Sequence, residues 1–128
     1  MNASTALRQY QAVNTNVMVA EASPHRLVQM LMDGQLSRMA QARGALERGQ
    51  LASKGELISR AIAIVGGLRG ALDMERGGEV AVNLDRLYEY MTRRLVEANA
   101  TNDLAILDEI SQLMRTIKSG WDAIAPLE

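Results

Sequence analysis

The stretch LDEISQLMRTIKSGWDAI, residues 107–124, shows most clearly which fold this sequence adopts. Its large apolar side chains recur at alternating steps of three and four residues, at Leu107, Ile110, Met114, Ile117, Trp121 and Ile124. Such a seven-residue repeat puts the apolar side chains on one stripe of an α-helix, and that stripe suits a nearly parallel or antiparallel contact with another helix. Because Pro126 prevents much extension beyond it, the pattern predicts a helix over residues 103–124.

Working back toward the N-terminus, three more segments carry a helical period, over residues 24–48, 54–74 and 80–99. The first opens at Ser23-Pro24, where serine caps the helix and proline loses no needed hydrogen bond. Ser53 and Glu56 have the spacing of a capping box, which predicts the start of the second. Gly77-Gly78 ends the second, and the third then presents one apolar face containing Leu84, Leu87, Tyr88, Met91 and Leu95.

No segment alternates apolar and polar residues strictly enough to favour a strand over a helix. Four amphipathic helices with short connections predict an all-α protein, an antiparallel up-and-down four-helix bundle formed as a single domain by residues 23–128. Residues 1–22 lack a sustained period, so they predict a mobile N-terminal arm or a short extra helix.

Composition narrows the class of protein. The net charge of −1 argues against a nucleic-acid binder, which needs a basic surplus to neutralise phosphates. No window approaches the 18 apolar residues of a membrane-spanning helix, and the N-terminus lacks the basic and apolar regions of a secretory signal. The absence of cysteine is compatible with a reducing compartment. The sequence therefore predicts a cytoplasmic protein.

Catalytic and metal chemistry have little support in the sequence. A histidine-phosphotransfer bundle exposes its histidine in an H-x-x-K-G pattern, whereas His25 is followed by RLVQ at the start of a helix. We therefore expect His25 to be an ordinary exposed or capping residue. One histidine and no cysteine disfavour a zinc or di-iron site. The prediction is a non-enzyme without metal or cofactor, with phosphotransfer kept as a weak alternative.

The run GGEVAVNLDRLYEY, residues 77–90, resembles the G-G-x-x-A-x-N-L-x-x-L-Y-x-Y signature of the flagellin-specific secretion chaperone family. Residues 23–28, SPHRLV, resemble the family's S-P-x-x-L-I helix opening, and Tyr10, residues 98–99 and Trp121 also match in order and spacing. The resemblance covers about residues 10–124. The chain departs from the family pattern at Met32, where an aromatic residue is usual.

This resemblance implies a function that periodicity alone does not reveal. Members of the family are helical bundles that bind newly made flagellin in the cytoplasm and hold its disordered C-terminal segment. They thereby prevent premature polymerisation and deliver flagellin to the flagellar type III export apparatus. An adaptor bundle for another protein client would share every physical feature of this chain, so it remains an alternative. The sequence also leaves a homodimer open.

A client that folds on binding needs an extended apolar surface beyond the chaperone's own core. Our candidates for a flagellin-binding groove are Ile58, Ile62, Val65, Tyr90 and Arg94. Core packing is an equal alternative for the two isoleucines, whereas Tyr88 and Trp121 are expected to be core. Tyr10 is predicted to cover the empty groove or to contact the export machinery.

Overall fold

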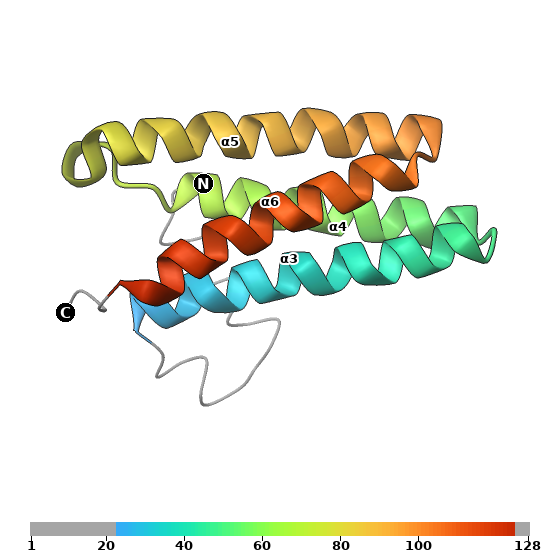
Figure 1. Ribbon diagram of the computed structural model, residues 1–128, viewed down its shortest axis with the longest axis horizontal. Helices are drawn as coiled ribbons and strands as arrows, with labels where there is room; N and C mark the ends of the chain where they lie inside the picture. The colour runs from blue at the N-terminus through green and yellow to red at the C-terminus, as the bar shows by residue number, and fades with distance from the viewer. Residues whose placement is uncertain (1–22, 125–128) are drawn as a thin grey trace.

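The computed structural model describes residues 23–124 and contains four α-helices in that range, labelled from α3 (Figure 1). They are α3 (Pro24–Glu47), α4 (Leu51–Gly70), α5 (Met74–Thr101) and α6 (Leu104–Ala123). No strand occurs between residues 23 and 124, which confirms the all-α bundle. The predicted N-terminal arm, with Tyr10, lies outside the described residues.

The helices pack as a closed ring of neighbours. Each helix contacts the next along the chain, and α6 returns to pack against α3. In Figure 1, α6 begins beside the end of α5 and crosses the bundle obliquely to finish beside the start of α3. All four helices contribute to one core, whose fully buried side chains include Met32, Met39, Ile58, Val65, Tyr88, Met91, Leu95, Leu107, Ile110 and Met114.

Local chemistry explains most helix ends. The Ser23 hydroxyl accepts a hydrogen bond from the Arg26 amide at 3.1 Å, as predicted for the start of α3. Gly49 has a positive φ of 73° just after α3, where glycine carries no steric penalty. The Asp103 carboxylate caps α6 by accepting from the Ala105 amide. Asn102, at φ 55°, is the one non-glycine residue with positive φ among residues 23–124.

Three predicted boundaries differ from the structure: both ends of the second helix, and the start of the third, which is Met74 and not residue 80. The second helix starts at Leu51 after Gln50, so Ser53 already lies in its first turn and does not cap it. The helix also stops earlier than predicted, at Gly70. Gly77 and Gly78 do not end it; they lie inside α5, which is kinked at Gly78 (φ 52°, ψ −127°). The predicted helix was too long because its apolar period continues past Gly70, although residues 71–73 form a loop.

Candidate functional site

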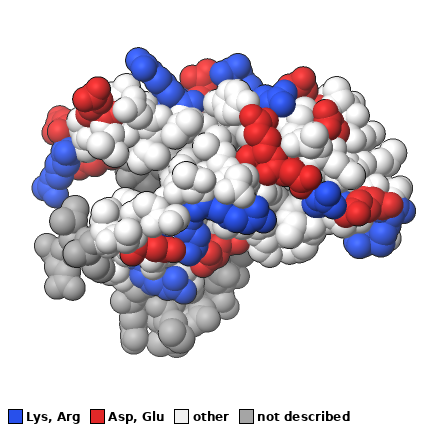
Figure 2. Space-filling view, viewed as in Figure 1, with Lys and Arg blue, Asp and Glu red and all other residues white. Residues whose placement is uncertain are grey.

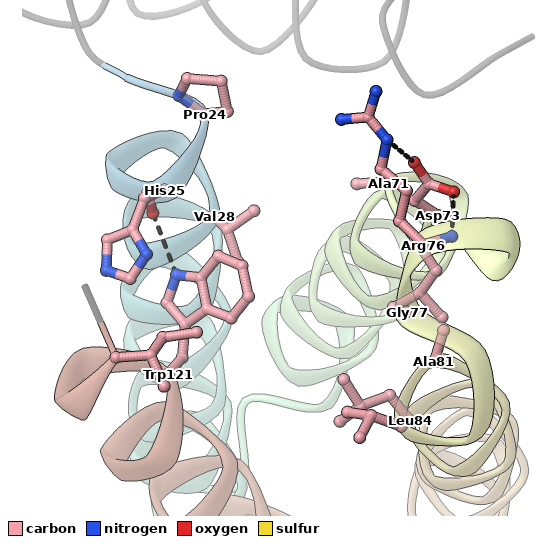
Figure 3. Close-up of a pocket in the computed structure, with 13 residues that line it drawn as sticks. Pro24, His25, Val28, Ala71, Asp73, Arg76, Gly77, Ala81, Leu84 and Trp121 are labelled. Carbon is pink, nitrogen blue, oxygen red and sulfur yellow. Dashed lines mark hydrogen bonds and ion pairs between the residues drawn. The ribbon is translucent and has the colours of Figure 1, made fainter. Parts of the chain in front are cut away.

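An apolar cleft of about 390 Å³ opens at one end of the bundle. It separates the start of α3 and the end of α6 from the loop after α4 and the first turns of α5 (Figure 3). Its lining residues are Pro24, His25, Val28, Ala71, Leu72, Asp73, Arg76, Gly77, Val80, Ala81, Leu84, Trp121 and Ile124.

Trp121 and His25 build one wall. Their rings stack with centroids 4.8 Å apart and an angle of 13° between the planes. The Trp121 indole N–H also donates to the His25 backbone carbonyl at 3.0 Å. Nearby, the Gln29 side-chain amide donates to the Asp122 carboxylate at 2.7 Å, which again joins α3 to α6. This wall is therefore fixed by several contacts between its two helices.

The opposite wall comes from the start of α5. The Asp73 carboxylate accepts from the Glu75 and Arg76 amides at 3.1 and 3.0 Å, so it caps the first turn. Beyond the kink, the buried side chain of Ala81 and the half-buried side chain of Leu84 face the cleft (Figure 3). This wall offers mainly small and apolar groups.

Two large apolar side chains stand exposed on the rim, one from each wall. Val80 is 67% exposed and Ile124 is 51% exposed. In Figure 2, mostly uncharged surface lies between α5 and α6 in the left half of the view, whereas charged groups gather where the two helices meet. An apolar cleft with apolar rims can bury the apolar face of a bound segment.

The structure does not expose two of the three predicted groove residues of α4. Ile58 is 0% exposed and Val65 is 1% exposed, so both are core residues, while Ile62 is half-buried against the core. Core packing, the alternative given for the two isoleucines, is therefore the role of Ile58. The stripe passes through Lys54, Ile58, Ala61, Val65 and Leu68, and Leu57 is only half-buried.

Tyr90 and Arg94 lie elsewhere, where α5 meets α6. The Tyr90 hydroxyl donates to the Glu109 carboxylate, and Arg94 donates to both Glu109 and Glu97. The hydrogen bond from Tyr90, followed by that from Arg94, lowers the pKa of Glu109. Tyr90 does turn away from the buried Tyr88, as predicted, but it is half-buried and faces α6. These two residues therefore belong to a polar contact within the bundle.

His25 also differs from the prediction that it is an exposed or capping residue. Its side chain is buried, with only 8% exposed, and Ser23 provides the cap. At that exposure the ring offers little surface to a phosphate donor. In residues 23–124, no group of three or more His, Asp or Glu side chains could hold a metal ion.

Sequence reasoning missed most of the cleft. Trp121 was assigned to the core because it continues the apolar stripe of its helix, but it is half-buried and faces the cleft. Val80 was not singled out, although it precedes Leu84 by four residues and so shares its helical face. The sequence did contain a signal for the cleft, because Val80 extends the apolar face of Leu84 toward the start of the helix.

Fold and cleft together define a four-helix bundle with an apolar cleft at one end. The model of the family described as "Flagellar protein FliS" matches residues 6–128. The chain belongs to this family of flagellar secretion chaperones, as the resemblance of residues 77–90 implied.

Similar proteins cover nearly the whole chain. A flagellar secretion chaperone FliSB of Pseudomonas aeruginosa strain PAO1 is 61% identical over 125 residues, covering 98% of this chain and 99% of the relative. FliS of Salmonella typhimurium strain LT2 is 42% identical over 127 residues, covering 98% and 94%. FliS of Bacillus subtilis strain 168 is 32% identical over 120 residues, covering 94% and 84%. The fold and the secretion-chaperone class therefore rest on full-length similarity.

Within residues 23–124, no helix is both long and apolar enough to cross a bilayer.

Proposed function

We propose that this chain is a cytoplasmic export chaperone that binds the disordered C-terminal segment of flagellin. By holding that segment it prevents premature polymerisation and delivers flagellin to the flagellar type III export apparatus. Membership of the secretion-chaperone family supports the class of function. The observation that carries the binding proposal is the apolar cleft between α3, α5 and α6, with Val80 and Ile124 exposed on its rims.

The cleft suits an amphipathic client segment. Its floor and walls hold half-buried apolar side chains, including Leu72, Leu84 and Trp121. A helix that forms on binding could lay its apolar side chains over these residues, and burial of that surface would offset the cost of ordering. We therefore place the main client contact at the cleft instead of on the α4 face through Ile58 and Val65.

Tyr90 and Arg94 remain in the proposal as a second contact. Their hydrogen bonds to Glu109 lie at an exposed surface, where ion pairs contribute little to stability. A client's polar groups can replace such bonds at small cost. Tyr10, outside the described residues, remains the proposed cover of the empty groove, and contact with the export machinery remains its alternative role.

The test is co-purification of this chain with full-length flagellin and with flagellin lacking its C-terminal segment. We expect a stable complex with the first and none with the second. Equal capture of both forms would contradict the assignment of the C-terminal segment as the bound region. Failure to capture either form would favour an adaptor for another client.

A further inference from the structure

One part of the α5 wall, the turn Asp73–Gly77, is set apart from the rest of the helix by Gly78. At Gly78 the backbone has φ 52° and ψ −127°, a combination far from helical. Residues with a side chain adopt it only under strain, whereas glycine does so freely. The turn formed by Asp73–Gly77 therefore joins α5 through one backbone position of unusual conformation.

Gly77 supplies clearance for the same turn. A Cβ atom added at Gly77 would lie 2.7 Å from the Ala81 Cβ, closer than two non-bonded carbon atoms approach, so the backbone would have to shift. Ala81 is only 3% exposed and lines the cleft. The two glycines thus have separate effects: Gly78 provides the bend, and Gly77 lets the turn lie close over Ala81.

The bonds that hold this turn are local. The Asp73 carboxylate caps the turn, and the Gly77 amide donates to the Asp73 carbonyl at 2.8 Å. Arg76 and Asp73 form an ion pair at 3.8 Å, with the Arg76 side chain 90% exposed. Segments with local hydrogen bonds and exposed side chains move at low free-energy cost. The Trp121 wall, by contrast, is joined across two helices by the stack and by two hydrogen bonds.

A client segment that enters the cleft contacts both walls. The part that is held least firmly gives way first, and that part is the Asp73–Gly77 turn.

We propose that the Asp73–Gly77 turn is a flap, hinged at Gly78, which swings outward to admit the client and then closes against it. This inference rests on the proposed function, because it takes the cleft to be the client site. In this proposal, Gly77 and Gly78 of the 77–90 signature allow part of the cleft wall to move.

Distance measurements between spin labels test the flap directly, since the chain has no cysteine of its own. One label pair joins Ser59→Cys on α4 to Glu75→Cys on the flap. The control pair joins Ser59→Cys to Glu89→Cys, which lies in α5 beyond the hinge; all three native side chains are exposed. A synthetic peptide of flagellin's C-terminal segment is the client.

We expect the peptide to shift or narrow the distances of the flap pair and to leave the control pair unchanged. A flap pair that does not respond to bound peptide would overturn the proposal, as would an equal response of both pairs. Peptide binding is measured separately by pull-down with the unlabelled chain. If the peptide does not bind in the pull-down, the proposed function fails. The hinge is then tested in the free chain. A distance distribution for the flap pair that is no broader than that of the control pair would overturn the hinge as well.

A substitution at the hinge gives a second test. Gly78→Ala forces a strained conformation or straightens the bend, so we expect peptide affinity to fall roughly tenfold. Gly120→Ala is the matched control, because it also adds one methyl group to a helix and meets nothing within 4 Å. Unchanged affinity in Gly78→Ala would contradict the hinge. The melting temperature of both variants shows whether the bundle itself is intact.

Discussion

The two ends of the bundle differ in how α5 and α6 meet. At the closed end, around Tyr88 and Glu109, the helices pack over buried side chains and are joined by hydrogen bonds from Tyr90 and Arg94. At the open end, α6 has crossed toward α3 and away from α5 (Figure 1). The apolar cleft lies at this end, between residues of α3, α5 and α6. The same apolar period therefore builds core at one end and lines an apolar cleft at the other. The crossing of α6 decides which role a residue has.

The largest expected effect is loss of the fold at the closed end. Ile58→Asp places an unpaired carboxylate at a fully buried position, and this costs several kcal/mol, comparable with the total stability of a small domain. Circular dichroism should show loss of cooperative unfolding. Ile62→Asp, on a half-buried side chain, should keep the helical spectrum. A folded Ile58→Asp variant would mean that this end is less closed than the structure indicates.

The next largest effect separates two aromatic residues. Tyr88 is 2% exposed, and burial raises its pKa to about 12. Tyr88→Ala should destabilise the bundle by about 3–5 kcal/mol in urea unfolding. Trp121→Ala, at the half-buried cleft wall, should cost about 1–3 kcal/mol and weaken client binding strongly. Tyr90→Ala should stay much closer to wild type in stability. A larger stability loss for Trp121→Ala than for Tyr88→Ala would reverse the comparison of the ends.

These residues show what the sequence can predict. The 3.6-residue period identified four helices and the burial of Tyr88, because that period depends only on local geometry. The period did not tell Ile58 from Leu57, since neighbouring apolar residues differ by only 100° around the helix. Nor did it predict the half-exposure of Trp121, which depends on the angle at which α6 crosses the bundle. That angle follows from packing among four helices, and no single segment encodes it.

A smaller effect on stability, but a large one on binding, is expected at the open end. Val80→Asp puts a charge on the cleft rim, where it stays hydrated until a client covers it. Client affinity should then fall by several kcal/mol, measured with the flagellin C-terminal peptide, while the fold persists. Val96→Asp is the matched control: it lies on the same helix and is similarly exposed, at 55% against 67%, but does not line the cleft. Equal binding by the two variants would remove the cleft from the client site.

The smallest effect concerns the pH dependence of the closed end. Bonds from Tyr90 and Arg94 lower the pKa of Glu109 from its ordinary value of 4.5. A carboxyl group with a lowered folded-state pKa contributes stability above about pH 4.5, and that contribution is lost as the pH falls through the lowered value. Glu109→Gln should therefore be less stable than wild type at pH 7 by no more than ~1 kcal/mol, since the group is exposed. The difference should shrink below pH 4.

Urea unfolding at pH 7, 5 and 3.5 measures this difference, with Glu79→Gln at the open end as the control. Glu79 is exposed on the first turns of α5, so its substitution should change stability only slightly. If Glu109→Gln behaves in the same way, the hydrogen bonds at Glu109 do not hold α5 to α6. The closed end would then depend on its buried side chains alone, and Tyr90 and Arg94 would be available to a client without any cost to the bundle.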